Sequence, residues 1–414
     1  MKICMISSFF GRNSFGGDSI YIERLSHALS RQGHDVHIVH SSSAYDLVRG
    51  SQPQRTCSIP PEIVIHDIGS RLGGKLSAFW NHQTGGAGLG FQKLGYLLKR
   101  TAFDLIHLHN VSLLGGRVLP DLLKSQAHAV KLVTAHDYWW ICPQSLFWKY
   151  GRKTCDACAC MSCALISHRP PQLWRRRDWF NSALSSIDAI LFPSQSTMEI
   201  YQSRGLVHPK QSMMPGLLPA DWDATRNSEE TARGSLSRSY FVSAGRLVIE
   251  KGFQKLIPMM KQMPDMDLRI AGCGPAEKLL RQLAHGLHNV RFEGLLDHDA
   301  IRRLFRGARA IIVPSLFPET FGLVAAEGLS LGIPVIARNR GSLPELINAT
   351  SGGLLFDSED QLADQMRRIA SDDDLFGRLS HSAATQIPQI WSEGFHVKAY
   401  LKLVASLRGE GAQS

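Results

Sequence analysis

Residues 308–331 read ARAIIVPSLFPETFGLVAAEGLSL, and this stretch shows how the chain is built. The run Ala308–Ser315 is almost continuously apolar, which is typical of a strand buried on both faces of a sheet. A loop that carries Glu319 follows it, and the segment Leu323–Leu331 has the length of a helix. A strand, a loop and a helix in this order form the repeating unit of a parallel sheet covered by helices.

The same alternation extends over the whole chain. In the first half, the runs that predict strands are Lys2–Phe10, Asp35–Ser42, Glu62–Ile68, Leu105–Asn110, Lys131–Asp137 and Ala189–Ser194. In the second half, they are Tyr240–Leu247, Asp267–Cys273, Val290–Gly294, Ala308–Ser315, Pro334–Asn339 and Gly353–Phe356. Helix-length segments such as Ser19–Gln32, Gly252–Gln262 and Pro275–His285 lie between them. We therefore expect an α/β fold with two doubly wound parallel sheets.

The composition is that of an ordinary soluble enzyme. The chain has 414 residues, of which 44% are hydrophobic and 20% charged, and this excludes disordered, collagen-like and disulfide-scaffold proteins. At about 100–200 residues per domain, two domains are expected. The sequence has no apolar run of about 18 residues or more, so it predicts no transmembrane helix. Met1–Phe10 reads as a buried strand rather than a signal peptide, and we expect a cytoplasmic protein.

The boundary between the domains is expected near Met213–Ala220, which contains two prolines and a glycine. The first domain then covers residues 1–212 and a linker covers residues 213–239. Residues 1–212 carry 23 Lys and Arg against 13 Asp and Glu, whereas residues 213–414 carry 23 of each. The positive excess suggests that the first domain meets nucleic acid, a phosphorylated acceptor or a membrane surface. A surface charge that only keeps the protein soluble is the alternative.

Glycine-rich turns follow several predicted strands, at the positions where doubly wound sheets bind ligands. After the first strand, Gly16-Gly17 precedes a helix that starts near Asp18 or Ser19, whose N–H groups favour a phosphate. The spacing is not Gly-x-Gly-x-x-Gly, so no nicotinamide or flavin site is indicated. A simple turn is the alternative.

The second half opens with a turn of the same kind. Arg246 follows a strand, and Lys251 lies five residues later, just before a helix. Two cations at this position suit a diphosphate, although an exposed loop with incidental charges gives the same pattern. The turn Gly272-Cys273-Gly274 follows the next strand at the same edge of the sheet.

The loop of the opening stretch adds two carboxylates. Glu319 precedes a helix that starts near Phe321 or Gly322, and Glu327 lies between one and two turns inside that helix. The side chain of Glu327 leans towards the helix N-terminus, where the first N–H groups hold phosphate or hydroxyl oxygens. A role of Glu327 as a cap or an ion-pair partner is the alternative.

Taken together, these motifs resemble the retaining glycosyltransferases of family 4. The resemblance rests on the pair Glu319 and Glu327, the stretch Gly245–Gly252 and the Gly16-Gly17 turn, and it runs from Met1 to about Leu403. It implies the GT-B fold, in which two Rossmann-like domains face a cleft. It also implies a donor domain over residues 240–388 and, within residues 389–414, a closing helix that crosses back onto the first domain. The linker departs from the family pattern, because it reads Met-Pro-Gly-Leu at residues 214–217 where many members have Asn-Gly-Val-Asp.

The resemblance implies roles for the site residues. Arg246 and Lys251 would hold the donor diphosphate and stabilise the leaving group, without a metal ion in catalysis. Glu319 would contact the transferred sugar, and His136 would lie beside it, although a histidine after a strand is otherwise a packing residue. The residues expected to bind the nucleotide and its phosphates are Gly16, Gly17, Gly274, Phe321, Gly322, Leu323 and Glu327, the last of them on the ribose. Fixed cations and helix N-termini stabilise the negative charge that grows on a departing diphosphate.

A cysteine-rich insertion covers about residues 138–180. Its cysteines are Cys142, Cys155, Cys158, Cys160 and Cys163. In a cytoplasmic chain two closely spaced Cys-x-x-Cys pairs favour a metal over disulfides, so we expect a structural zinc ion held by four of the five. Reduced cysteines without a metal are the alternative.

The insertion is also basic and aromatic, with Tyr138–Trp140, Trp148–Tyr150 and Trp174–Phe180. Tryptophan with arginine suits a lipid–water interface or stacking on sugars or bases. Because the family binds acceptors on the first domain, we expect this patch to dock a polyprenyl-diphosphate-linked glycan at an anionic membrane. An ordinary packed helix face is the alternative.

The function expected from the sequence is hexose transfer in cell-surface polysaccharide biosynthesis. The donor would be a GDP- or UDP-sugar, the acceptor a glycan or lipid-linked glycan, and the anomeric configuration would be retained at the inner face of the cell membrane. Other GT-B activities, a nucleotide-sugar epimerase or a phosphorylase, are the enzymatic alternatives. A zinc-stabilised protein that binds nucleic acid is disfavoured, because the set of donor-site residues is intact.

Overall fold

The computed structural model describes residues 1–50, 52–70, 73–86, 89–167, 170–175, 179–219 and 240–409, with backbone only for residues 89–91. The chain divides into two compact units. Unit 1 consists of Met1–Leu217 with Glu393–Ser414, and unit 2 of Leu218–Ser392. Residues 220–239 of the expected linker lie outside the described residues.

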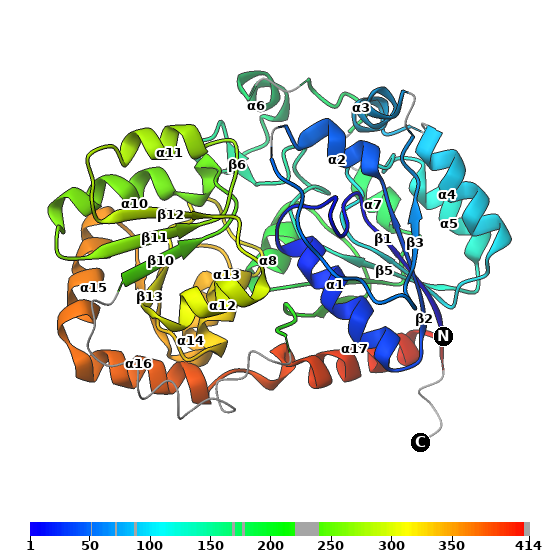
Figure 1. Ribbon diagram of the computed structural model, residues 1–414. Helices are drawn as coiled ribbons and strands as arrows, with labels where there is room; N and C mark the ends of the chain where they lie inside the picture. The colour runs from blue at the N-terminus through cyan, green and yellow to red at the C-terminus, as the bar shows by residue number, and fades with distance from the viewer. Residues whose placement is uncertain are drawn as a thin grey trace. The chain divides into compact units, whose positions relative to one another are not determined.

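Unit 1 contains a parallel sheet of seven strands in the order β3-β2-β1-β4-β5-β8-β9 (Figure 1). Its strands are β1 (Lys2–Ile6), β2 (Asp35–His40), β3 (Val64–Asp67), β4 (Leu105–Leu108), β5 (Val130–Thr134), β8 (Ala189–Phe192) and β9 (Gln211–Met213). Ile3 of β1 pairs with Val36 on one side and with Leu105 on the other. The strand order reverses direction between β1 and β4, which makes this the switch point of the sheet.

Helices cover both faces of the sheet of unit 1. They are α1 (Gly16–Arg31), α2 (Ser42–Val48), α3 (Gly74–Thr84), α4 (Leu89–Arg100), α5 (Leu119–Leu123), α6 (Cys160–Ile166), α7 (Trp179–Leu184), α8 (Gln195–Ser203), α17 (Glu393–Leu407) and the short η1 (Lys124–Gln126). A small antiparallel hairpin of β6 (Trp148–Lys149) and β7 (Lys153–Thr154) lies in the cysteine-rich insertion.

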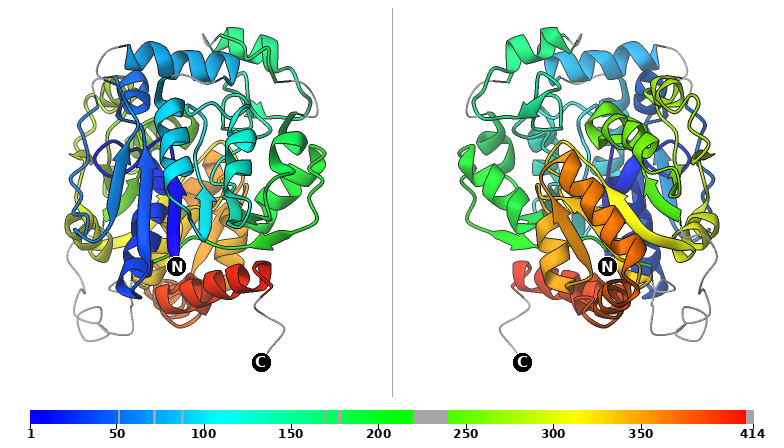
Figure 2. Two further views of the ribbon diagram at one scale, coloured as in Figure 1. Left: turned by 90° about the vertical axis from the view of Figure 1, so that its right-hand side faces the viewer. Right: turned by 90° about the vertical axis from the view of Figure 1, so that its left-hand side faces the viewer.

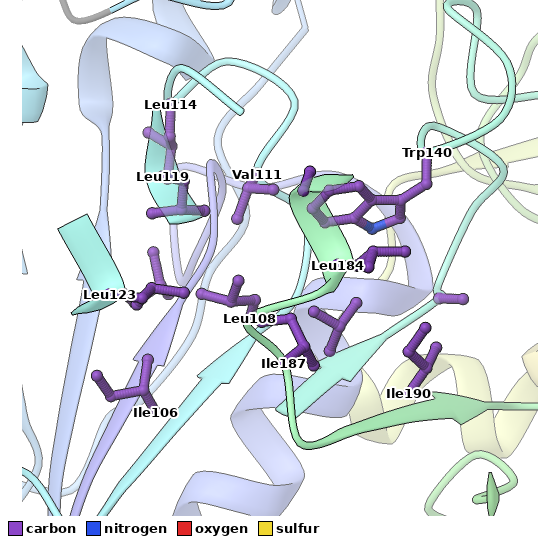
Figure 3. Close-up of a cluster of buried hydrophobic side chains, with 14 of the residues drawn as sticks. Ile106, Leu108, Val111, Leu114, Leu119, Leu123, Trp140, Leu184, Ile187 and Ile190 are labelled. Carbon is purple, nitrogen blue, oxygen red and sulfur yellow. The ribbon is translucent and has the colours of Figure 1, made fainter. Parts of the chain in front are cut away.

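Alternation along each strand divides the interior of unit 1 into two cores. Ile3 and Met5 of β1 face one core, together with side chains of α1 and α17, and these two helices contact each other. Cys4 and Ile6 face the other core. Figure 3 shows part of this second core, where strand residues such as Ile106 and Ile190 lie beside side chains of α5, α7 and the insertion. Side chains of a strand alternate between faces, so one apolar run supplies both cores.

Unit 2 repeats the plan with six parallel strands in the order β12-β11-β10-β13-β14-β15. They are β10 (Tyr240–Ala244), β11 (Asp267–Ala271), β12 (Val290–Gly294), β13 (Ala308–Val313), β14 (Val335–Arg338) and β15 (Gly353–Phe356). The helices are α10 (Phe253–Met259), α11 (Glu277–Leu283), α12 (His298–Arg306), α13 (Leu323–Ser330), α14 (Leu343–Thr350), α15 (Glu359–Ser371), α16 (Asp373–Thr385), η3 (Ile249–Lys251), η4 (Met260–Gln262) and η5 (Gln389–Trp391). Phe241 and Ile312 face one core, and Val242 and Ile311 face the other.

The prediction of two doubly wound parallel sheets is confirmed, and a strand lies within or overlaps each of the twelve predicted runs. Several runs continue past the strand that they contain. Ser7–Phe10, for example, leave the sheet after β1. Polar groups that follow a strand at its carboxyl end are therefore placed at the ligand-binding edge.

Candidate functional site

The carboxyl ends of β10 and β13 meet at the switch point of the sheet in unit 2. The segment Gly245–Gly252 follows β10, and the loop with Glu319 follows β13. The N–H of Leu316 donates to the carbonyl of Glu250 at 2.8 Å, so the two segments are bound to each other. Crossover connections that run in opposite directions leave a crevice at this point of a doubly wound sheet.

Lys251 and Glu319 form an ion pair at this edge. Nζ of Lys251 lies 2.6 Å from Oε1 of Glu319, and the hydroxyl of Ser315 donates to the same oxygen. Glu319 is buried, whereas Lys251 is partly exposed and lies 5.2 Å from the ring centre of Phe317. Two predicted site residues thus come together, with the ammonium group placed to reach a ligand.

Glycines allow the turns around this ion pair to pack closely. Gly252 has φ +81°, and a Cβ atom there would lie 2.1 Å from the carbonyl oxygen of Pro314. Gly274 lies against Leu247, whose N–H donates to the carbonyl of Cys273 at 2.9 Å. A residue with a side chain does not fit in either place without a shift of the backbone.

Arg246 lies in the same group of turns and is partly buried. Burial and the charge of Glu277 raise the pKa of Cys273 in the Gly272–Gly274 turn, and the charge of Arg246 opposes that rise. The structure therefore places Arg246, Lys251, Glu319 and Gly274 on connected loops of one sheet edge.

Helix α13 begins at the same edge. Gly322 precedes it with φ +84°, and no described side chain caps the helix. The first-turn N–H groups, including that of Leu323, have no partner within the helix and attract anions. Phe321 is buried beside Trp391, with ring centres 5.7 Å apart. Glu327 is buried in the second turn of α13.

Unit 1 has its own group of polar residues at the carboxyl ends of β1, β4 and β5. Helix α1 begins at Gly16, which has φ +75°, and continues through Gly17 with no side-chain cap among the described residues. His136 follows β5, and its Nε2 lies 2.9 Å from Nδ1 of His109, which follows β4. The ring centre of Tyr21 lies 5.0 Å from that of His136.

These histidines are neutral. Burial lowers the pKa of His136 to about 3 and lowers the pKa of His109 well below its usual value. Because the ring of His136 carries no charge near neutral pH, it is suited to hydrogen bonding with a ligand rather than to pairing with a phosphate.

Three polar residues at this edge were not predicted as site residues from the sequence. The amide nitrogen of Asn110 donates to Asp137 at 3.2 Å and to Asp18 at 3.5 Å. Burial raises the pKa of Asp18 to about 6, and burial and the charge of Asp18 raise the pKa of Asp137 to about 7. The signal that was available is position, since Asn110 and Asp137 are the last residues of predicted strands and Asp18 follows the glycine turn.

The five clustered cysteines have mixed environments. All eight cysteines of the chain are free thiols, with Cys163 buried and Cys158 and Cys160 exposed. Sγ of Cys163 accepts a hydrogen bond from the N–H of Tyr150 at 3.3 Å. Within the described residues, no three His, Cys, Asp or Glu side chains gather closely enough to hold a metal ion. For Cys142, Cys155, Cys158, Cys160 and Cys163, the zinc site thus stays a prediction.

The tryptophans of the insertion mostly face inwards. Trp139, Trp140 and Trp148 are buried. The guanidinium of Arg175 lies over the rings of Trp139 and Trp179, at 4.5 and 4.7 Å, and burial lowers its pKa to about 9. A ring packed in the core cannot contact a lipid, so the expectation that Trp139, Trp140 and Trp148 belong to a docking patch is wrong. Docking by the rest of the expected patch stays a prediction. Residues 176–178 of the predicted patch lie outside the described residues.

No helix in the described part of the chain has both the length and the hydropathy needed to cross a bilayer.

Comparison with known proteins gives matches in both units. The family described as Glycosyltransferase Family 4 matches residues 15–213, and the family Glycosyl transferases group 1 matches residues 228–386. A GDP-mannose-dependent monoacylated alpha-(1-6)-phosphatidylinositol monomannoside mannosyltransferase of Corynebacterium glutamicum is 26% identical over 230 residues, which are 50% of this chain and 59% of that protein. Across the curated relatives considered, the match spans between 22% and 62% of their length.

Solved structures are similar over nearly the whole chain. A sucrose-phosphate synthase from Thermosynechococcus elongatus has a TM-score of 0.73 at 19% identity, over 99% of this chain and all of that one. The Anabaena protein HepE in complex with UDP-glucose has a TM-score of 0.68 at 16% identity, over 98% of this chain and all of that one. These likenesses establish the fold.

Proposed function

The chain belongs to the family 4 glycosyltransferases with the GT-B fold, and we propose that it transfers a hexose from a nucleotide diphosphate-sugar to a glycan or lipid-linked glycan. The observation that carries the proposal is the ion pair of Lys251 and Glu319 beside the start of α13, at the switch point of unit 2. Cations, a buried carboxylate and main-chain N–H groups are together the set that a sugar diphosphate requires.

The proposed step is the departure of a nucleoside diphosphate from the sugar. Lys251 has three N–H donors, so it can keep its bond to Glu319 and still donate to a phosphate. Arg246 and the first turn of α13 add further positive potential where negative charge grows on the leaving group. Fixed donors of this kind need no reorganisation during the reaction and lower its barrier directly. We propose that this happens without a catalytic metal ion.

We propose that the two carboxylates accept hydrogen bonds from the transferred sugar and from the ribose of the nucleotide. Glu319, held by Lys251 and Ser315, is fixed in position to accept hydrogen bonds from the hydroxyl groups of the transferred sugar. Glu327 is assigned to the ribose. In unit 1, the turn at Gly16 and Gly17 is assigned to the diphosphate, and the neutral His136 to a sugar hydroxyl. Retention of the anomeric configuration is proposed on the family resemblance.

For the nucleotide base of the donor and for the acceptor, we propose a chemical class rather than a single compound. The C. glutamicum relative is named for GDP-mannose and the HepE structure for UDP-glucose, so a GDP- or a UDP-sugar is proposed here. The acceptor is proposed to be a glycan of the cell surface, lipid-linked and reached at the anionic inner face of the membrane. The positive excess of residues 1–212 supports an anionic partner.

The donor is identified by a melting-temperature screen against UDP, GDP, ADP and their sugars. One nucleotide and its sugar should raise Tm, because a ligand at 100 times its Kd stabilises a protein by about 2.7 kcal/mol. If none raises Tm, the proposed function loses its support.

The cations are tested with Arg246→Ala and Lys251→Ala. Each substitution is expected to lower kcat by roughly 100-fold or more, as the loss of one charge-stabilising group does. Lys278→Ala, which removes an exposed lysine of α11, is the matched control and should keep the wild-type kcat. Turnover close to that of the wild type in both site variants would falsify their role.

A further inference from the structure

Two side-chain pairs join β4 to β5 at the ligand-binding edge of unit 1. The parallel register sets His107 of β4 beside Leu132 of β5, and residues two apart on a strand share one face of the sheet. Nε2 of His107 lies 2.7 Å from Oγ1 of Thr134. Two residues further along both segments, Nδ1 of His109 lies 2.9 Å from Nε2 of His136. The contact between the two histidines is therefore built into the register of the sheet.

The rings of His109 and His136 meet edge to edge. Their centres are 5.1 Å apart and their planes differ by 25°, whereas the bonded nitrogens are 2.9 Å apart. Because the lone pair of an imidazole nitrogen lies in the plane of the ring, this arrangement suits a hydrogen bond. His109 is 2% exposed, and His136 is partly exposed. Of the two, His136 can therefore meet a ligand, and His109 lies behind it.

Neighbouring side chains hold both rings in place. The ring centre of His107 lies 4.0 Å from that of His109, and Nδ1 of His107 lies 2.9 Å from the hydroxyl of Tyr400 in α17. The ring centre of Tyr21 in α1 lies 5.0 Å from that of His136, and its hydroxyl also bonds α17. Helix α17, the red helix below the strands of unit 1 in both views of Figure 2, contacts α1. Two helices thus fix the row of rings against the sheet.

The positions of the ring protons follow from these hydrogen bonds. Both rings are neutral because burial lowers their pKa values, so each carries a single N–H. No described residue forms a hydrogen bond with Nε2 of His109, which is buried. A buried N–H without a partner is rarer than a buried acceptor without one, so the proton of His109 lies on Nδ1 and is donated to His136. Nε2 of His136 then accepts, and its own proton lies on Nδ1.

We infer that His109 is a positioning residue, which holds His136 in one orientation and in the tautomer that presents Nδ1–H to an oxygen of the transferred sugar. The inference rests on the proposed function, in which His136 contacts a sugar hydroxyl, and adds that His136 is the donor of that hydrogen bond. Without His109, the ring of His136 can turn about its last torsion, whose energy wells are broad, and can exchange tautomers. Part of the molecules would then present a bare nitrogen to the sugar.

The tautomer is tested by nuclear magnetic resonance of the full chain with isotope-labelled histidine nitrogens, because protonated and bare ring nitrogens differ in chemical shift. His136→Gln identifies the signals of His136 by their loss. We expect His136 to be protonated at Nδ1 in the wild type and to show both tautomers in His109→Phe. His109→Asn, whose side-chain amide nitrogen takes the place of Nδ1, should restore the wild-type signals. A wild-type His136 protonated at Nε2, or unchanged signals in His109→Phe, would overturn the inference.

The consequence for the ligand is tested by calorimetry with the nucleotide found in the melting screen and with its sugar. His109→Phe should weaken binding of the nucleotide sugar by about 5-fold or more, the effect of losing one neutral hydrogen bond, and leave binding of the nucleotide unchanged. His109→Asn should keep the wild-type affinity for both. In a His136→Ala background, His109→Phe should have no further effect, because a double-mutant cycle separates action through His136 from packing. An equal loss in both backgrounds would assign His109 to packing alone and overturn the inference.

His208→Phe is the matched control, because His208 is also a buried histidine of unit 1 with a bonded ring. Its Nε2 lies 2.9 Å from the carbonyl oxygen of Ile187, which precedes β8, so it belongs to the amino-terminal edge of the sheet. The substitution should leave the signals of His136 and both affinities unchanged. A loss of nucleotide-sugar affinity equal to that in His109→Phe would overturn the inference. Circular dichroism checks that each variant is folded.

The two experiments separate this inference from the proposed function. A nucleotide sugar that binds the wild type and His109→Phe equally well supports the proposed function and overturns the inference. If no nucleotide or nucleotide sugar raises Tm, the proposed function fails, and the ring signals still decide whether His109 sets the tautomer of His136.

Discussion

Asp137 is partly buried, and this burial together with the charge of Asp18 controls how Asp137 responds to pH. The pKa of Asp137 is about 7 in the folded protein, far above its usual value. A carboxyl group with a raised pKa binds more protons in the folded than in the unfolded chain. Its contribution to stability is complete at low pH and is lost as pH rises through the folded pKa.

Asp137→Asn should therefore gain stability relative to the wild type as pH rises from 4 to 7. The difference in the free energy of unfolding is expected to grow by at most roughly 1.4 kcal/mol per pH unit and to level off above pH 7. Urea unfolding of both proteins at several pH values measures it. Curves that stay parallel from pH 4 to pH 8 would show that Asp137 titrates normally.

Gly252 is the residue that lets the turn after β10 approach β13. Gly252→Ala is expected to destabilise the protein by about 1–3 kcal/mol for the left-handed backbone, with a further cost from the close contact with Pro314. Gly286→Ala is the matched control, since Gly286 has φ +80° and nothing lies within 4 Å of its added Cβ. Thermal unfolding of both variants isolates the cost of the contact, and equal losses would mean that the approach to Pro314 is loose.

At the scale of secondary-structure elements, the apolar runs predicted the strands because central strands of a parallel sheet are buried on both faces. Besides the two-residue strands of the hairpin β6-β7, the missed strand is β9 (Gln211–Met213), a short edge strand without an apolar run, which pairs with β8 through its backbone. The tryptophans of the insertion were misplaced for a different reason. Composition cannot tell whether Trp139 and Arg175 meet a lipid or, as the structure shows, each other.

The cysteine-rich insertion is the element whose prediction still needs a measurement. Three of its residues, Ser145, Phe147 and Tyr150, have positive φ, which costs energy that close packing or a metal can offset. We expect one zinc ion per chain by elemental analysis, and a lower metal content and Tm in a variant with Cys155→Ser and Cys158→Ser. Metal-free protein with an unchanged Tm in the variant would leave reduced thiols as the explanation.

At the scale of the whole molecule, the sequence predicted which residues follow strands better than it predicted their partners. Lys251 and Glu319 were predicted because each lies just beyond a strand end, and the parallel order of β10 and β13 brings such positions together. Asp18 and Asn110 were missed because each, taken alone, is typical of the end of a helix or a strand, and only the fold brings them together across 92 residues.

Hydrogen exchange tests whether both units hold the donor. With the nucleotide found in the melting screen, we expect slower exchange at residues 16–19 of unit 1 and at residues 245–252 and 320–325 of unit 2. The N–H groups of these turns are the proposed partners of the diphosphate, and a bound N–H exchanges slowly. Protection confined to unit 2 would remove Gly16 and Gly17 from the donor site.

Helix α17 comes last in the chain yet covers a face of the first sheet, beside α1 (Figure 1). During translation, this face of the sheet lacks α17 until residues 218–392 have been synthesised. At about 5–20 residues per second, their synthesis takes on the order of 10–40 s. Until then, the core around Ile3 and Met5 lacks Val397, Tyr400 and Val404 of α17, and we expect chaperones to bind the nascent chain at this incomplete core.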